Sequence, residues 1–473
     1  MDSGGDQTGP GTGISDAEKV GSSSCKVCHT TVAIGQLFNS SVHDTAATGC
    51  EGCHGGGQFH KGVGPIPFPS PTVVQCAQCH ETTSPGFLAR HSGDDPATDH
   101  TNTSVIEGYV FTSCEECHAP KDPATLQWAH NPAAAAIHQQ WGNSAHAGRI
   151  ASDTPDTAQV WGHYNWDQTT GTGNRAGCQR CHTATGAKNF LNSPTTYTPA
   201  NNDFSHLSDW TAATGSSQNE LLYCSSCHSD VATGVLRNPG AITEVYAAAT
   251  AGNTAGTATF AYPNLEASNL CMGCHLGREI GDNIKNDNDA DGVRGFINSH
   301  YLAAGGMIFN VSGYEYAATG YDTLGVHKQV GQADAFGTGT NGPCVTCHMS
   351  GPEPHTFTAS AASTACASCH GGLTDATLET SKHEFSLALV ELKTVLESKG
   401  IYFYEAHPYF YTAPYVVGGT NTGFTNWAGV YGLDSWKDVM GAAFNYNLVK
   451  HDPGAFVHNR QYALNSSRTP LTS

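Results

Sequence analysis

The sequence has few of the residues that normally build and cover a globular core. Of its 473 residues, 13% are charged and 38% are hydrophobic, whereas ordinary soluble domains have about 25% and about 45–50%. It is rich in glycine instead, with 54 residues, and by composition alone such a chain would be loose or disordered. We therefore expect a group other than side chains to supply much of the core.

Positive charge and long apolar runs are also scarce. Lysine and arginine number 21 against 41 aspartates and glutamates, which gives a formal charge of −20 and excludes a nucleic-acid binder that uses a basic surface. No apolar run approaches the roughly 20 residues of a membrane span. Met1 leads directly into a polar stretch without the segments of a signal peptide. We interpret the sequence as that of a mature or trimmed chain whose export signal is not included.

Cysteine occurs only in nine C-x-x-C pairs, and each pair is followed at once by histidine. C-x-x-C-H is the attachment signature of c-type haem. Two thioethers reach the vinyl groups on one edge of the macrocycle, and the histidine binds the iron as proximal ligand. Zinc knuckles, iron–sulfur sites and redox C-x-x-C pairs do not require that histidine. The motifs therefore predict nine haem c groups and leave no cysteine for a disulfide.

The predicted thioether cysteines are Cys25, Cys28, Cys50, Cys53, Cys76, Cys79, Cys114, Cys117, Cys178, Cys181, Cys224, Cys227, Cys271, Cys274, Cys344, Cys347, Cys366 and Cys369. The predicted proximal ligands are His29, His54, His80, His118, His182, His228, His275, His348 and His370.

Haem is attached to such motifs outside the cytoplasm, so an exported protein is expected. The sequence resembles the multihaem c-type cytochromes on the outer surface of metal-respiring bacteria, a group that includes filament-forming (nanowire) members. The resemblance extends from about Cys25 to Tyr462 and includes CEGCHGGGQFHKGVGPIPFP, CHLGRE followed by SHYLAAGG, CVTCHM followed by PHTF, and HDPGAFVHNRQYA. It implies an extracellular or outer cell-surface location, redox donor proteins of the periplasm or outer membrane, and electron acceptors such as metal oxides in anaerobic respiration.

The nine motifs begin 22 to 73 residues apart, which argues against one tandem repeat. Glycine, proline, asparagine and threonine between them predict a multihaem cytochrome c fold, mostly coil with short α-helices wrapped around a closely packed haem chain and little or no β-sheet. We expect a flexible N-terminal arm (1–22), a nonahaem body (23–375) and a haem-free, aromatic-rich helical cap (376–473) that supplies a distal histidine. The 15 aromatics of residues 401–473 form either a small core or a docking surface for another subunit.

Helices are expected over four segments: 131–146, begun by Asn-Pro; 381–400, begun by a capping box at Ser381 and Glu384; 434–450; and 456–464. In the second segment Phe385, Leu389, Leu392 and Leu396 lie on one face.

Distal ligands must come from the 16 histidines that lie outside the motifs. The resemblance implies His43, His60, His146 and His458. His300, His327 and His355 are candidates because they recur around the seventh and eighth motifs, and His100 and His163 complete a set of nine. The remaining seven form a reserve: His91, His130, His138, His206, His383, His407 and His451. The sequence does not assign a distal histidine to each haem.

Two imidazoles on every iron leave no open coordination site, so we expect an electron carrier rather than an enzyme. A compact chain of this length has a radius of gyration of about 23 Å, so nine haems would lie nearly edge to edge. The alternatives are a multihaem reductase of nitrite, hydroxylamine or a sulfur oxyanion, which needs a five-coordinate haem, and a monomeric surface electron carrier. No C-x-x-C-K variant, which marks the catalytic haem of many nitrite reductases, is present.

A loop at residues 287–293 matches the first half of an EF-hand. Asp287, Asp289 and Asp291 alternate before Gly292, with the Val293 carbonyl as a fourth ligand. Asn298 stands where the last glutamate of an EF-hand is expected. The loop predicts a calcium site, and an ordinary surface turn is the alternative.

Assembly into a head-to-tail filament of identical chains is expected, with one haem chain running through it. A heterologous interface that does not close into a ring must propagate. A terminal haem would then take its distal ligand from the adjacent subunit, with His43 or His458 as the donor.

Overall fold

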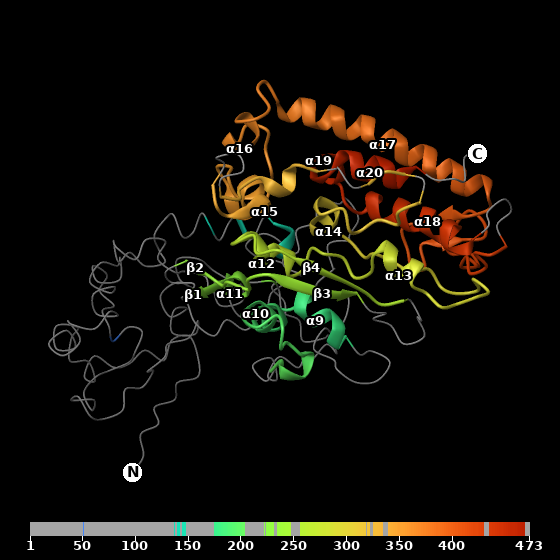
Figure 1. The fold of residues 1–473 in the computed structure, drawn as a ribbon, viewed down its shortest axis with the longest axis horizontal. Coiled ribbons are helices and arrows are strands. Elements are labelled where there is room, and N and C mark those ends of the chain that lie inside the picture. The colour runs from blue at the N-terminus through green and yellow to red at the C-terminus, as the bar shows by residue number, and fades with distance from the viewer. Residues whose placement is uncertain are drawn as a thin grey trace, which may run out of the picture. The chain divides into compact units, whose positions relative to one another are not determined.

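Figure 1 shows the computed structural model of the chain. It describes residues 175–203, 224–230, 234–246, 256–317, 319–321, 325–333, 339–429 and 435–468, together with positions 51 and 222 and several positions between 137 and 147. The cysteines and histidines of the first four motifs lie outside the described residues. So do the N-terminal arm and the candidates His43, His60, His100 and His163.

The chain divides into two compact units. The first contains residues 1–237 with 353–357, and the second contains residues 238–352 with 358–473. The expected arm, nonahaem body and cap stay a prediction. The short segment around His355 belongs to the first unit and packs with residues far before it in the sequence. The backbone N–H of His355, for example, donates to Gln140 Oε1 at 3.2 Å.

The described part of the first unit consists of short helices and one hairpin. Its elements are η3 (Ala145–Ala147), η5 (Ala176–Cys178), α9 (Gln179–His182), α10 (Ala184–Asn192), η6 (Pro199–Asn201), α11 (Cys224–Cys227), β1 (His228–Asp230), β2 (Val235–Leu236) and η9 (Pro354–Thr356). Helix α10 begins after Thr183, whose hydroxyl accepts from the Gly186 N–H, and it contacts both α9 and α11.

The second unit carries longer helices toward its C-terminal end (Figure 1). Its elements are β3 (Ile242–Tyr246), β4 (Ala258–Tyr262), α12 (Ser268–Met272), α13 (Gly281–Lys285), α14 (Ala304–Ile308), η8 (His327–Gln329), α15 (Gly342–His348), α16 (Thr364–Ala367), α17 (Asp375–Ser398), β5 (Tyr402–Phe403), β6 (Phe410–Tyr411), α18 (Trp436–Lys450), α19 (Ala455–His458) and α20 (Arg460–Ser467).

Strands pair only in two-stranded antiparallel sheets within the described ranges: β1 with β2, β3 with β4, and β5 with β6. In the β3–β4 pair Ile242 lies opposite Tyr262 and Tyr246 opposite Ala258, and the buried phenols of Tyr246 and Tyr262 are hydrogen-bonded at 2.6 Å. Short helices with so little sheet agree with the fold expected from the sequence. No helix of the described part combines the length and apolar character that crossing a bilayer requires.

A side-chain core fills the C-terminal part of the second unit, where α17 lies along α18, α19 and α20 (Figure 1). The predicted face of α17 packs inward, with Phe385, Leu392 and Leu396 buried. Trp427, Phe444 and Tyr462 are fully buried in the same core. The aromatic-rich segment therefore builds a core here, which favours the first of its two interpretations.

Two helix boundaries differ from the sequence expectation. Helix α17 begins at Asp375 rather than near Ser381, because Thr374 and Thr377 form the capping box, and the Ser381 hydroxyl accepts from Arg460 Nη1 instead. The last helix is split into α19 and α20 at Asn459, whose Oδ1 accepts from the Tyr462 N–H. Helix α18, by contrast, lies within two residues of its expected bounds.

Candidate haem-iron sites

Five of the nine motifs lie in the described residues, each on or just after a short helix. A C-x-x-C sequence on a helical turn brings both cysteines to one face, with the histidine following on the next turn. At two motifs the histidine N–H closes that turn, from His275 to the Cys271 carbonyl at 2.9 Å and from His370 to the Cys366 carbonyl at 2.8 Å. Local helix formation thus presents both thiols and the imidazole together.

Three motif histidines each face a second histidine that was predicted to be a distal ligand. The ring centroids of His228 and His355 lie 6.5 Å apart. Those of His348 and His458 lie 6.2 Å apart. Those of His370 and His327 lie 6.1 Å apart. The structure therefore associates three candidates with particular motifs, which the sequence did not do.

These separations fit one metal ion between each pair of rings. If an iron lies midway between two imidazoles and each metal–nitrogen bond is about 2 Å long, the ring centroids lie about 6 Å apart. The interplanar angles differ, at 21°, 47° and 72°, and axial ligation permits this because each ring can turn about its metal–nitrogen bond. The residues present therefore fit a haem iron with two axial histidines.

Hydrogen bonds at Nδ1 fix which nitrogen of these rings is available to a metal. Nδ1 of His228 lies 3.0 Å from the Gly234 carbonyl, and Nδ1 of His327 lies 2.6 Å from the Val457 carbonyl. Because a carbonyl oxygen only accepts, Nδ1 carries the hydrogen and Nε2 keeps the lone pair. This is the tautomer that coordinates a metal through Nε2.

Burial favours the neutral form of the proximal histidines of two further motifs. Burial lowers the pKa of His182 to about 4. Burial also lowers the pKa of His275, although the Leu302 carbonyl near its Nδ1, at 3.3 Å, acts in the opposite direction. A neutral imidazole is the form that binds a metal, so both residues suit the predicted proximal role.

The described motif helices of the second unit lie next to one another. Helix α12 contacts α15, which contacts α16, so the motifs beginning at Cys271, Cys344 and Cys366 are consecutive in space. The side chains of Cys271 and Cys344 lie within hydrogen-bonding reach of each other. In the first unit, α10 contacts both of the motif helices α9 and α11.

Two predicted distal ligands lie in the described residues without such an assignment. The ring of His146, in η3, packs edge-on against Phe357 at 4.5 Å between centroids. His300 has a left-handed backbone, with φ of 68°, and its ring contacts Tyr301 at 5.3 Å. Both assignments stay predictions. Of the reserve, His383 is exposed on α17, and His451 contacts the ring of Tyr301 at 4.4 Å.

Sequence reasoning missed two residues that position His458. Asp452 holds Nδ1 of His458 with both carboxylate oxygens, each at 3.0 Å. Gly454 leaves room for the imidazole, because a Cβ there would lie 2.5 Å from His458 Cε1. Both lie in the stretch HDPGAFVH, where an aspartate and a glycine just before a candidate ligand were the available signal.

The carboxylates of the predicted calcium loop accept hydrogen bonds from backbone N–H groups of the same loop. Oδ1 of Asp287 accepts from the Asp289 N–H at 2.7 Å, and Oδ1 of Asp291 accepts from the Val293 N–H at 2.9 Å. The other oxygen of Asp287 is bound by the Arg294 guanidinium in a buried ion pair. No group of three or more metal-binding side chains is gathered in the described ranges, and calcium at this loop stays a prediction.

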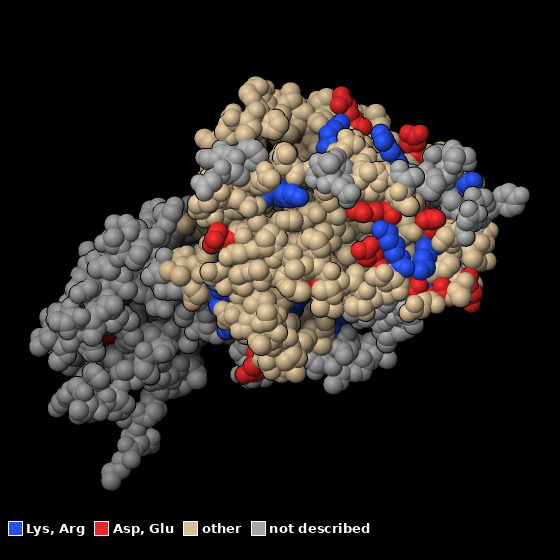
Figure 2. Space-filling view, viewed as in Figure 1, with Lys and Arg blue, Asp and Glu red and all other residues tan. Residues whose placement is uncertain are grey.

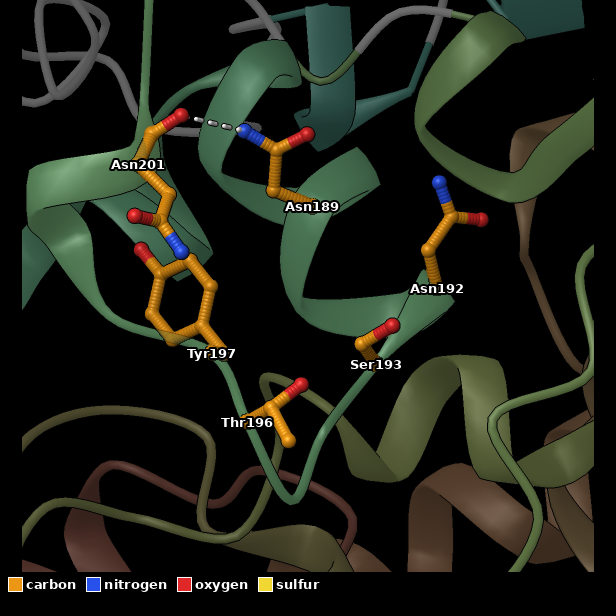
Figure 3. A pocket seen from close by; sticks show the side chains of 6 residues that line it. All are labelled: Asn189, Asn192, Ser193, Thr196, Tyr197 and Asn201. Carbon is orange, nitrogen blue, oxygen red and sulfur yellow. Dashed lines mark hydrogen bonds between the residues drawn. The ribbon is translucent and has the colours of Figure 1, made fainter.

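Other surface features offer no comparable chemistry. Figure 3 shows a hollow at the end of α10, of about 320 Å³, lined by Asn189, Asn192, Ser193, Thr196, Tyr197 and Asn201. These side chains include no histidine, cysteine or methionine and no carboxylate for acid–base catalysis. Figure 2 shows a face on which charged residues are sparse and the two signs lie close together.

Motif helices bearing paired imidazoles define a multihaem c-type cytochrome, and comparison with known proteins agrees. Residues 150–237, which contain two of the motifs, match the family described as C-type polyheme cytochrome domain 2. The C-type polyheme cytochrome OmcB of two Geobacter sulfurreducens strains is 36% identical to the chain, over 96% of this chain and 89% of OmcB.

The chain therefore belongs to the C-type polyhaem cytochromes, as the sequence motifs predicted, and such proteins carry covalently bound haem c. It is also 46% identical to the C-type polyheme cytochrome OmcC of the same species, over 76% of this chain and 54% of OmcC. No solved structure matches the chain.

Proposed function

We propose that the chain carries respiratory electrons to external acceptors such as metal oxides, through nine c-type haems at the cell surface or in the extracellular space. The observation that carries this proposal is the set of three histidine pairs at the separation suited to one iron. Redox proteins of the periplasm or outer membrane are the proposed donors. Membership of the polyhaem cytochromes supports electron transfer as the general activity.

Bound haem supplies a reversible one-electron Fe(III)/Fe(II) couple. In this proposal three irons would each be held by two histidines: His228 with His355, His348 with His458, and His370 with His327. Filled axial positions leave no site for a substrate. An unchanged ligand set in both oxidation states favours electron transfer over catalysis, since little reorganisation accompanies reduction.

The order of the motif helices supports conduction through the second unit. The motifs on α12, α15 and α16 follow one another by direct contact, so an electron could pass from the first haem to the third through the middle one. A multihaem reductase is the alternative function. It would need an open iron among the haems that are not covered by the three pairs.

Spectroscopy of single variants tests the proposed ligands. We expect the purified protein to carry nine haems by the pyridine haemochrome assay. His458→Ala and His327→Ala should each convert one haem from low-spin to high-spin in electron paramagnetic resonance (EPR) and magnetic circular dichroism. His383→Ala is the matched control, because His383 is exposed on α17, and it should leave the spectra unchanged. Unchanged low-spin spectra in both test variants would contradict the pairing, and a high-spin haem in the wild type would favour the reductase.

A head-to-tail filament is the finer form of the proposal. Because His458 faces His348 of its own chain, it is better suited to an intramolecular role, and His43 is then the proposed donor across a subunit boundary. Electron microscopy of wild type and His43→Ala tests this. We expect filaments of wild type that shorten in the variant. Monodisperse particles of one chain at every concentration would support the monomeric carrier instead.

A further inference from the structure

We propose that Asp452 lowers the reduction potential of the iron held by His348 and His458 below that of the other two paired sites. Asp452 thereby acts as a positioning and tuning residue for electron transfer. The inference rests on the proposed ligation, and it concerns the carboxylate behind one ligand rather than the ligands themselves.

Asp452 is fixed in the turn between α18 and α19. Its side chain is 1% exposed. Oδ1 accepts from the Gly454 N–H at 3.1 Å, and its carbonyl accepts from the Ala455 N–H at 3.0 Å. Both carboxylate oxygens lie 3.0 Å from Nδ1 of His458, at the end of the same helical turn. Turning the carboxylate away from the ring would break its hydrogen bond with the Gly454 N–H just before α19.

One histidine of each site has a known acceptor at Nδ1, and these three acceptors differ in charge. His228 and His327 donate from Nδ1 to the neutral carbonyls of Gly234 and Val457, whereas His458 donates to a carboxylate. A hydrogen bond to an ionised acceptor is roughly twice as strong as a neutral one. A carboxylate behind a ligating histidine also raises the basicity of the coordinating nitrogen.

The lysine and the arginine closest in sequence to Asp452 bind other partners. Lys450 lies 3.5 Å from Glu405, and the Arg460 guanidinium donates to the Ser381 hydroxyl at 2.9 Å. The negative charge of Asp452 consequently acts on His458 and on the iron beyond it. In a buried site such a charge interacts strongly with its surroundings because the effective dielectric constant is low.

The redox consequence follows from the charge balance. Reduction adds one electron, donated by a neighbouring haem, to Fe(III) and gives Fe(II), while the hydrogen on Nδ1 stays in place. A more basic ligand and a fixed negative charge both stabilise the more positive Fe(III) form. This site lies on α15, between the motif helices α12 and α16, so the lowest potential falls at the middle of three consecutive haems.

Asp452→Asn tests the inference, because asparagine keeps the oxygen acceptor and the turn but removes the charge. The EPR signal of this haem is first assigned as the one lost in His458→Ala, and the other two signals by loss in His327→Ala and His355→Ala. In a potentiometric titration of Asp452→Asn, the reduced-to-oxidised ratio of the assigned haem at a fixed potential should rise about tenfold, which is about 59 mV for one electron. Asp452→Glu should restore most of the wild-type value.

Asp438→Asn is the control, because it neutralises a carboxylate that accepts from the Tyr314 hydroxyl rather than from an imidazole. A titration of Asp452→Asn that superimposes on wild type, with low-spin spectra retained, would overturn the inference. Should that variant not accumulate, the wild-type titration decides, because the His458-assigned haem must then have the lowest of the three potentials. A failure of His458→Ala to remove any low-spin signal would instead refute the proposed ligation.

Discussion

The ring planes of His228 and His355 are inclined by 21°, and their centroids lie 6.5 Å apart. One follows directly after a motif helix, and the other belongs to the short segment 353–357, which packs with the first unit although its neighbours in sequence belong to the second. Under the proposed ligation, the position of this segment in the first unit brings a second histidine to a motif that is distant in the sequence.

His355→Ala should leave the haem of the motif at Cys224 with one axial ligand. We expect a shift of one haem to high spin in the visible and EPR spectra, because His228 remains on the other face. Added imidazole should restore the low-spin spectrum, since it can occupy the vacated position. A variant that stays fully low-spin without imidazole would show that another residue binds this iron.

Phe444→Ala should destabilise the C-terminal core by about 3–5 kcal/mol, the usual cost of truncating a buried phenylalanine. Phe444 is fully buried on α18, which packs against α17 and α20. Guanidinium unfolding followed by far-ultraviolet circular dichroism measures the change. Leu387→Ala, at a position of α17 that is 56% exposed, is the control and should shift the curve little.

Gly292→Ala should be more harmful than a typical glycine substitution. Gly292 has φ of +66°, and a Cβ there would lie 2.6 Å from Cγ of Trp436. Gly418→Ala separates the two effects, because Gly418 has φ of +73° but no atom within 4 Å of the added Cβ. We expect Gly418→Ala to cost about 1–2 kcal/mol of backbone strain and Gly292→Ala to cost more, measured by chemical unfolding. Equal losses would contradict the contact.

The fold should lose stability at low pH, partly because Glu405 becomes protonated. Burial opposes ionisation of this carboxyl, but hydrogen bonding to His451 and the charges of His451 and Lys450 outweigh it and lower its pKa. A depressed carboxyl pKa stabilises the fold above the unfolded value of about 4.3, and this contribution is lost as the pH falls through the lower folded pKa. Glu405→Gln should therefore flatten the acid limb of stability against pH, whereas Glu379→Gln, at an exposed site, should leave it steep.

Arg294→Ala should raise the affinity of the loop at residues 287–293 for calcium. The guanidinium occupies Asp287 in the buried ion pair, and a metal ion would compete for the same carboxylate. Isothermal titration calorimetry with Ca²⁺ compares the variant with wild type. Lys285→Ala is the control, because Lys285 pairs with Asp282 at 3.2 Å instead. Identical affinities in wild type and Arg294→Ala would exclude Asp287 as a ligand.

Haem attachment could be predicted from the sequence because each C-x-x-C-H motif consists of five consecutive residues. The five described motifs and the inward face of α17 could be predicted from residues that are close together in the sequence. Which distal histidine serves which motif could not be predicted, since His228 meets His355 and His370 meets His327 through the tertiary fold. The start of α17 was misplaced because Thr374 and Ser381 both carry a capping hydroxyl, and the contact of Ser381 with Arg460 is invisible in the sequence.

Helix α19 contributes to two of the histidine pairs at once. Its last residue, His458, faces His348, while the carbonyl of the preceding residue, Val457, accepts from Nδ1 of His327, which faces His370. Under the proposed ligation, this single helical turn positions one ligand of each of two irons. If this turn moves when one iron is reduced, we expect the basicity of a ligand of the other iron to change. The reduction potential of each iron should then depend on the oxidation state of the other.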